Sequence, residues 1–363
     1  MKRFIKWLMK VLIAELIFIM GIITVSIIKG DIDIEYEIGK FQSSNGLYEQ
    51  EDLNSQYYEN LENYNGEETN DKNLNQSKYF YNQLTKNAKI FYNQIYKNKE
   101  NLKTGTYKID FKNIFSKELN TDIGKEQIGD DFQSAIEAVI YDNPDIFYIN
   151  PNKMYMNIET ITKIYKVENN VFIDNGNKGK YLSDEFKTKE EVDIAEEKIE
   201  KEKEYILQRK TGNVYRDIKM VHDYLVDNVA YDTTLKEPHI YSIYGALVNK
   251  KAVCEGYAKS FKYLMDELGI PCIIVTGESK NSKGNIEKHA WNYVQIDQRW
   301  YAVDVTWDDP IIRGGRTNNK IKYRYFLKGE ETFKVDHFPK NRFTENGKEF
   351  KLPMLTQMDY KIR

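Results

Sequence analysis

The sequence predicts an α+β fold in which a helix that begins at a cysteine packs against an antiparallel sheet. The first observation is an amphipathic run after Cys254, which Gly269 ends and Pro271 prevents from continuing. The second is the apolar run of residues 272–276, which is typical of a buried strand. The third is a pair of strand-like runs, HAWNYVQI and WYAVDVTW, joined by a connection short enough for a hairpin.

Composition limits the classes of function that the chain can serve. Hydrophobic residues make up 41% and aromatic residues 13%, which is enough for a folded core. The 53 basic and 56 acidic side chains nearly cancel, which argues against a nucleic-acid partner. Neither of the glycine-rich motifs GxxxxGK(S/T) and GxGxxG is present, so we expect no nucleotide. The sequence implies no cofactor and no metal.

Residues 1–30 predict a signal anchor that remains as a transmembrane helix. Four basic side chains in residues 2–10 precede an apolar run over 11–28, which only Glu15 interrupts. Eighteen helical residues span roughly 27 Å, close to the hydrocarbon thickness of a bilayer. The charge pattern places the N-terminus inside and the rest of the chain outside the membrane. A cleaved signal peptide and a buried core helix are the alternatives.

The chain after this anchor divides into four expected segments. Residues 31–77 carry twelve carboxylates against two lysines and predict an acidic disordered linker. Residues 78–204 predict a small α+β accessory domain whose role the sequence does not state. Its expected elements are helices from Tyr79 and over 126–141, strands at 146–149 and within 153–175, and a long helix that a Thr188–Glu191 capping box begins. Residues 205–335 form the expected catalytic domain, and 336–363 a C-terminal extension.

Cys254 is the candidate nucleophile. It lies in the first turn of its predicted helix, where free N–H groups and the helix dipole favour a thiolate. Glu255 partly offsets that effect, and Gly256 permits another segment to approach closely. The alternative is a small buried cysteine, a description that fits Cys272 better because it lies within an apolar strand.

His289 and Asp304 are the candidate base and orienting group. A hairpin loop of two residues, 297–298, makes Asp304 oppose Trp291 and places it diagonally from His289 on the same face. A loop of three residues would put the two side chains on opposite faces. A cysteine becomes a catalytic nucleophile when a base takes its proton and a third group orients that base.

The runs VCEGYAKSF, HAWNYV and WYAVDVTWDDP, in this order, resemble the transglutaminase-like domain of many bacterial proteins, a relative of papain-type folds. The resemblance covers roughly residues 205–335, and DNPDIFYI is similar to a segment found ahead of such domains. It implies that Cys254 is the nucleophile, His289 the base and Asp304 the orienting group. Gln298 departs from the pattern, since this turn often has glycine.

The substrate contacts are less defined. Tyr241 and Tyr244 are candidates for a second oxyanion donor by placement alone, and Trp291 for a substrate groove, although core packing is the favoured alternative for Trp291. His222 has no ligand companion at short spacing, which favours a structural or helix-surface role.

The sequence thus predicts a membrane-anchored, extracytoplasmic cysteine enzyme that acts on a protein or peptide of the cell envelope. It transfers or hydrolyses an acyl group through a thioester. The alternative is a non-catalytic envelope-binding or scaffolding module that keeps the fold.

Overall fold

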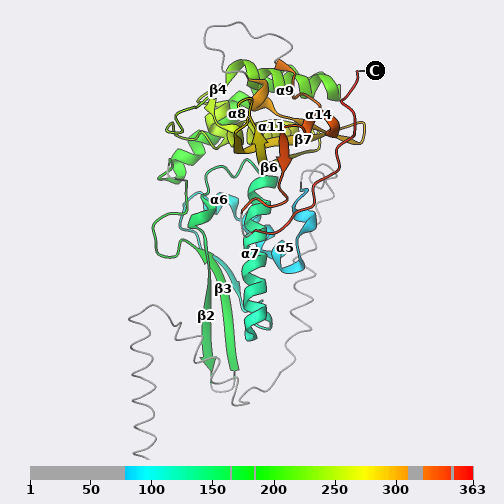
Figure 1. Cartoon of the computed structure of the whole chain (residues 1–363). Coiled ribbons are helices and arrows are strands. Elements are labelled where there is room, and N and C mark those ends of the chain that lie inside the picture. Colours follow the sequence, from blue (N-terminus) through cyan, green and yellow to red (C-terminus); the bar gives the residue numbers. More distant parts are fainter. Residues whose placement is uncertain (1–77, 164–165, 184, 310–321, 345–346, 363) are drawn as a thin grey trace, which may run out of the picture. The chain divides into compact units, whose positions relative to one another are not determined.

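The computed structural model describes residues 78–163, 166–183, 185–309, 322–344 and 347–362 (Figure 1). The expected signal anchor and acidic linker, residues 1–77, lie outside the described residues. Within the described ranges, no helix combines the length and the apolar character needed to cross a membrane. The described chain falls into two compact units.

The smaller unit holds most of a three-stranded sheet. Its described residues are 110–122, 157–163 and 166–172. The strands follow the order β1-β3-β2, and their bounds are β1 (Ile109–Lys112), β2 (Tyr155–Lys163) and β3 (Lys166–Asp174). The strands expected within residues 153–175 are therefore confirmed.

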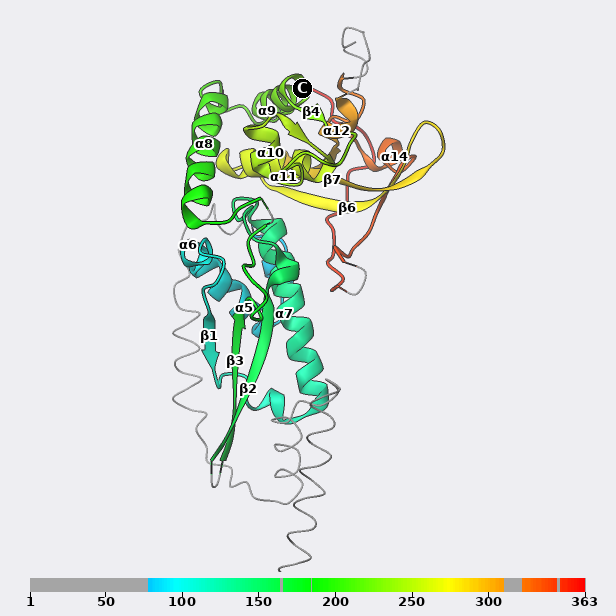
Figure 2. The same cartoon turned by 90° about the vertical axis from the view of Figure 1, so that its left-hand side faces the viewer.

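The larger unit is built on a four-stranded antiparallel sheet with the order β8-β7-β6-β9. Its strands are β6 (Cys272–Lys280), β7 (Ile286–Ile296), β8 (Arg299–Val303) and β9 (His337–Pro339). Helix α11 (Cys254–Glu267) packs against β6 and β7, as Figures 1 and 2 show. This mixed arrangement confirms the α+β class.

The remaining α-helices of the larger unit include three that the sequence predicts, at Lys86–Lys97, Asp122–Asp142 and Lys189–Leu207. Their bounds are α5 (Lys86–Lys97), α6 (Lys99–Leu102), α7 (Asp122–Asp142), α8 (Lys189–Leu207), α9 (Val214–Asn228), α10 (Ile243–Leu247), α12 (Val305–Asp308) and α14 (Glu330–Phe333). Two short strands, β4 (Ala230–Tyr231) and β5 (Lys251–Ala252), pair in parallel. Helix α7 starts four residues before its expected start at 126.

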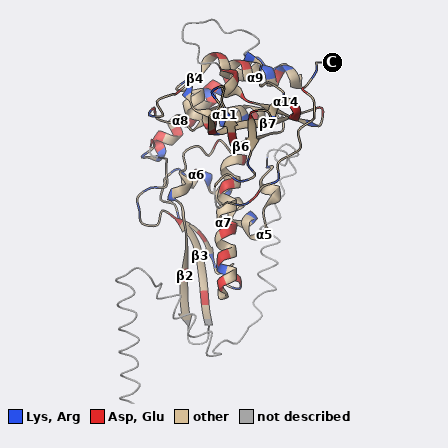
Figure 3. Ribbon diagram, viewed as in Figure 1, with Lys and Arg blue, Asp and Glu red and all other residues tan. Residues whose placement is uncertain are grey.

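The long helix α8 begins as the capping box predicts. The Thr188 hydroxyl accepts a hydrogen bond from the Glu191 N–H at 3.2 Å, while the Glu191 carboxylate accepts from Lys187 N. Its stripe of Val192, Ala195, Ile199 and Ile206 is buried. Acidic side chains recur along α7 (Figure 3).

Two expected elements are wrong, in addition to the end of the run WYAVDVTW, which forms helix α12 and not a strand. The first helix does not run from Tyr79, because Leu84 is extended and Thr85 caps a new helix at Lys86. Residues 146–149 form no strand, since their ladder is limited to one bridge between Ile149 and Leu182. Both errors arise where an apolar run is short and its conformation depends on tertiary neighbours.

Candidate active site

Cys254 is the first residue of α11. Val253, the N-cap, is extended and offers no side-chain cap to the first turn. The N–H groups of that turn have no acceptor within the helix, so they and the helix dipole favour a negative charge on Cys254. The thiol is partly exposed, as access by a substrate requires.

A close backbone approach fixes this helix start. The Val253 N–H donates to the Ile240 carbonyl at 3.0 Å, and a Cβ on Gly256 would lie 2.4 Å from the same oxygen. Glycine is therefore required at position 256, which confirms the expected close approach of another segment. The position of Cys254 depends on this crossing.

The surroundings of Cys254 are largely apolar. The Glu255 carboxylate forms an ion pair with Lys259 at 2.6 Å, so its charge is partly offset before it can oppose a thiolate. Tyr141 of α7 and Cys254 pack against the same small cluster, which comprises Ala258, Ile274 and Ala290. The Tyr141 ring stacks on Phe343 with ring centroids 3.6 Å apart.

The hairpin between β7 and β8 has the register that a two-residue loop predicts. Ile296 pairs with Arg299, and both loop residues, Asp297 and Gln298, have positive φ angles of 51° and 61°. Such angles at both central positions define the turn whose twist matches a hairpin. The turn forms with Gln298 in place of the glycine that often occurs there.

This register brings His289 and Asp304 together. The ladder ends with the pair Asn292 and Val303, so Asp304 follows on the side of Trp291. His289 Nε2 lies 2.7 Å from Asp304 Oδ2, and Cys254 is close enough to His289 to raise the pKa of its ring. Because Nε2 faces the carboxylate, Nδ1 is the ring nitrogen left for the thiol. The structure therefore places the three predicted side chains in one series.

The electrostatics of the pair favour a charged histidine. Burial lowers the pKa of His289, but the Asp304 charge, the hydrogen bond to Asp304 and the contact with Cys254 raise it to about 10. Burial opposes the charge of Asp304, yet His289 and His337 hold its pKa well below the usual range. His289 is 8% exposed and Asp304 is fully buried. The arrangement therefore favours a positively charged His289 beside an ionised Asp304.

Asp304 has a second structural task at the start of α12. Its Oδ1 accepts a hydrogen bond from the Trp307 N–H at 3.1 Å, so the residue is also the helix N-cap. The carboxylate is thus fixed from both of its oxygens. One oxygen is held by the backbone, and the other faces the histidine.

His337 is a member of the site that the sequence did not reveal. Its Nε2 lies 3.0 Å from Asp304 Oδ2, and its Nδ1 lies 2.8 Å from Asp336 Oδ1. It belongs to β9, where it pairs with Ser279 of β6, and it lies beyond the boundary expected at residue 335. The only signal available was the scarcity of histidine, since the chain has four.

The donor atoms of His289, Asp304 and His337 lie within 4.8 Å of one another, a spacing that a metal site also requires. Two ligand atoms on one tetrahedral zinc ion are about 3.3 Å apart, given metal–ligand distances near 2.0 Å. The two nitrogen–oxygen distances, 2.7 Å and 3.0 Å, are shorter and match charge-assisted hydrogen bonds. We therefore describe the cluster as hydrogen-bonded.

The three predicted substrate-contact residues have different environments. Trp291 is 1% exposed and packs against Phe333 and His337, as the core-packing alternative expects. Tyr241 is 50% exposed, whereas the Tyr244 ring contacts His239 at 4.7 Å between centroids.

Tyr231 is a neighbour of the cysteine that the sequence did not single out. Burial raises the pKa of its hydroxyl to about 12, and the nearby charge of Cys254 acts in the same direction. Its short strand, β4, carried no periodic signal that could have shown this placement.

His222 forms a second buried histidine–carboxylate cluster. Its Nε2 lies 3.1 Å from Asp308 Oδ2 and its Nδ1 3.2 Å from Asp223 Oδ1. The side chain is fully buried, so the structural role is confirmed and the helix-surface alternative is wrong. Asp308 also accepts from the Tyr325 N–H at 2.8 Å, which ties the end of α12 to the following segment.

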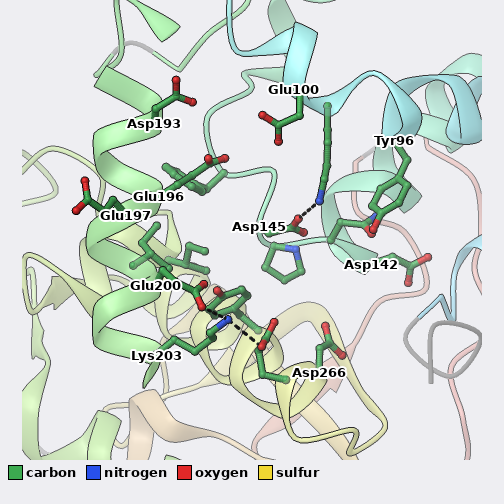
Figure 4. A pocket seen from close by; sticks show the side chains of 18 residues that line it. Tyr96, Glu100, Asp142, Asp145, Asp193, Glu196, Glu197, Glu200, Lys203 and Asp266 are labelled. Atoms are coloured by element: carbon green, nitrogen blue, oxygen red, sulfur yellow. Dashed lines mark hydrogen bonds and ion pairs between the residues drawn. The ribbon is translucent and has the colours of Figure 1, made fainter. Parts of the chain in front are cut away.

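A separate cavity of about 670 Å³ is acidic (Figure 4). Its carboxylates are Glu100, Asp142, Asp145, Asp193, Glu196, Glu197, Glu200, Asp266 and Glu267. Lys203 bridges two of them, at 2.6 Å and 3.0 Å, and Lys99 pairs with Asp145 at 3.0 Å. None of the candidate catalytic residues lines it, so it is distinct from the site at Cys254.

Part of the chain matches a known protein family. Residues 202–305 match the family described as the transglutaminase-like superfamily. This stretch begins in α8 and includes all three candidate catalytic residues. The chain therefore carries a transglutaminase-like domain, which confirms the resemblance seen in the sequence.

Individual relatives are more distant. The chain is 27% identical over 150 residues to the kyphoscoliosis peptidase of Mus musculus, a match that covers 38% of this chain and 22% of the relative. The corresponding match to the Homo sapiens protein is 28% over 138 residues, covering 34% and 21%. The chain thus spans about a fifth of the length of these relatives. A crystal structure described as a TGase is 19% identical, with a TM-score of 0.29, over 48% of this chain and 49% of that one.

Proposed function

We propose that the protein is a cysteine enzyme that forms a thioester at Cys254 and then transfers or hydrolyses the acyl group. The observation that carries the proposal is the series of contacts from Asp304 through His289 to Cys254, with the cysteine at a helix N-terminus. A nucleophile, a base and a group that orients the base are the requirements of this chemistry.

In the first half-reaction the Cys254 thiolate attacks the carbonyl carbon of a carboxamide or peptide bond. The Cys254 N–H at the helix start is available to the oxyanion that forms. The tetrahedral intermediate then expels the amine, which takes a proton from His289. A carbon–sulfur bond has formed and the carbon–nitrogen bond has broken, which leaves a thioester and a neutral imidazole.

In the second half-reaction an acceptor attacks the thioester. His289 removes a proton from the acceptor, and the Cys254 thiolate leaves. Asp304 keeps the imidazole in its orientation throughout and stabilises its charged form. A primary amine as the acceptor gives a cross-link, whereas water gives hydrolysis.

Both outcomes use the same three side chains, so an experiment has to determine whether an amine or water accepts the acyl group. The matched relative is named a peptidase, which supports hydrolysis as the first outcome to test. The full chain, in detergent, is incubated with a fluorescent primary amine and cell-envelope proteins. Label on protein supports transfer, and new fragments support hydrolysis. Neither product from the unaltered protein, or equal product from Cys254→Ala, contradicts the proposal.

We further propose that residues 1–30 anchor the protein in a membrane with the catalytic domain outside, where envelope proteins or peptides are its substrates. The basic cluster followed by an apolar run supports this orientation. Fractionation of cells that express the full chain, or the chain without residues 1–30, tests the anchor. Equal recovery of both forms in the soluble fraction contradicts it.

The non-catalytic scaffold is the less favoured function, because all three groups of the candidate site are present. It predicts that Cys254→Ala retains every cellular effect of the protein. Complementation of a deletion strain with Cys254→Ala and with the unaltered chain separates the two functions.

A further inference from the structure

We infer that His337 is a positioning residue of this site. Its buried imidazolium ring holds the Asp304 carboxylate, so that the negative charge of Asp304 is divided between His337 and His289. The inference rests on the proposed function and adds to it a fourth group, which β9 supplies. Two histidines then use one carboxylate oxygen, Asp304 Oδ2.

The hydrogen bonds of His337 define its charge. Each ring nitrogen faces a carboxylate oxygen, Nε2 at 3.0 Å from Asp304 and Nδ1 at 2.8 Å from Asp336. An ionised carboxylate only accepts hydrogen bonds, and Asp336 accepts another from the Tyr325 hydroxyl at 2.7 Å. Both ring nitrogens are therefore placed to donate, which is the arrangement of an imidazole ring with a proton on each nitrogen.

The packing of β9 fixes this ring independently of Asp304. A Cβ on Gly277 of β6 would lie 2.3 Å from the Phe338 carbonyl, so glycine is what allows β9 to approach. The Phe333 ring stacks on His337 with centroids 3.9 Å apart, and the side chain of His337 is fully buried. A rigid neighbour of this kind limits the movement of the Asp304 carboxylate.

Acidic and basic side chains alternate along the series Cys254, His289, Asp304, His337 and Asp336. The Tyr325 ring also faces His337, with centroids 5.1 Å apart, and the charge of Arg324 acts on Asp336. The His289 and His337 ring centroids lie 5.8 Å apart, so a positive charge on His337 opposes the binding of a proton by His289. His289 is thereby a stronger acid toward a departing amine than Asp304 alone would make it.

The test is the pH dependence of Cys254 alkylation by iodoacetamide, followed by mass spectrometry on the full chain. His337→Gln keeps an N–H donor toward Asp304 but removes the charge. We expect the pH at which His289 loses its proton to rise by about one unit, with a neutral-pH rate within about threefold of the unaltered protein. His337→Phe removes the donor as well, and we expect the neutral-pH rate to fall about tenfold.

His222→Gln is the matched control, because His222 is equally buried between two carboxylates but does not contact the site. We expect it to lower the thermal midpoint and to leave the pH profile of Cys254 unchanged. An unshifted profile in His337→Gln, or an equal shift in His222→Gln, overturns the inference while a reactive Cys254 still supports the proposed function. A Cys254 no more reactive than Cys272 overturns the proposed function itself.

Discussion

The side-chain amide of Asn292 donates a hydrogen bond to the backbone carbonyl of Ala258, at 3.0 Å. Asn292 lies three residues after His289 in β7, and Ala258 lies four residues after Cys254 in α11. A second bond, at 3.3 Å, reaches the Ile273 carbonyl in β6. One buried amide therefore joins the helix that carries the cysteine to the strand that carries the histidine.

We expect Asn292→Ala to lower the free energy of unfolding by about 1–3 kcal/mol, because it removes buried hydrogen bonds. It should also slow alkylation of Cys254, since α11 loses its link to β7. Chemical denaturation and alkylation kinetics measure the two effects. Asn228→Ala is the control, because the exposed Asn228 amide bonds only to the Tyr224 carbonyl one turn earlier, and about 0.5 kcal/mol or less is expected there. Equal losses in both variants would contradict this role.

Gly256→Ala should displace the start of α11. The added Cβ would meet the Ile240 carbonyl at 2.4 Å, and that atom belongs to the backbone and cannot move aside cheaply. We expect lower stability and a slower reaction of Cys254, whose position depends on this turn. The matched change Gly129→Ala, in α7, meets nothing within 4 Å and should be neutral or stabilising. A Gly256→Ala protein with unaltered alkylation kinetics would show that the crossing does not position the thiol.

The parts of the site that the sequence could predict depend on local patterns. The start of α11 follows from an apolar stripe with a glycine stop, and Gly269 indeed has a φ of +68°. The pairing of His289 with Asp304 follows from loop length, because two-residue hairpins fix the register of both strands.

The remaining parts depend on contacts between distant segments. Strand β9 has three residues, too few for a periodic signal, and follows Asp304 by more than thirty residues. Tyr141 packs against the same apolar cluster as Cys254 but comes from α7, a helix that the sequence assigned to an accessory domain without a stated role. Neither placement follows from spacing, because both require knowledge of how the sheet and helices pack.

Alkylation should distinguish the two cysteines. Burial raises the pKa of Cys272, which is 1% exposed, so its thiolate is scarce and inaccessible. Cys254 is partly exposed at a helix N-terminus and contacts His289. We expect iodoacetamide to label Cys254 at least tenfold faster near neutral pH, and His289→Ala to reduce that difference. Equal and slow labelling of both residues in the folded protein would contradict an activated thiol.

The stability of the protein should depend on pH through His289. Its folded pKa of about 10 lies above the value near 6.5 of an unfolded histidine, so the proton stabilises the folded state. That contribution is complete below about pH 6.5 and is lost as the pH rises through 10. The difference in unfolding free energy between the unaltered protein and His289→Gln should therefore decline over this window, as denaturation at a series of pH values measures.

The difference in unfolding free energy between the unaltered protein and His239→Gln should change with pH in the opposite direction. Burial lowers the pKa of His239, so its neutral form is the one that the folded state favours, and the contribution is lost as the pH falls below the unfolded value. Asp304 also contributes to stability in a way that is lost at acid pH, because its pKa is held low and its carboxylate stabilises the folded state only while ionised.

For His289→Gln, a difference in unfolding free energy that stays constant between neutral and alkaline pH would show that the proton on His289 is not coupled to folding through Asp304.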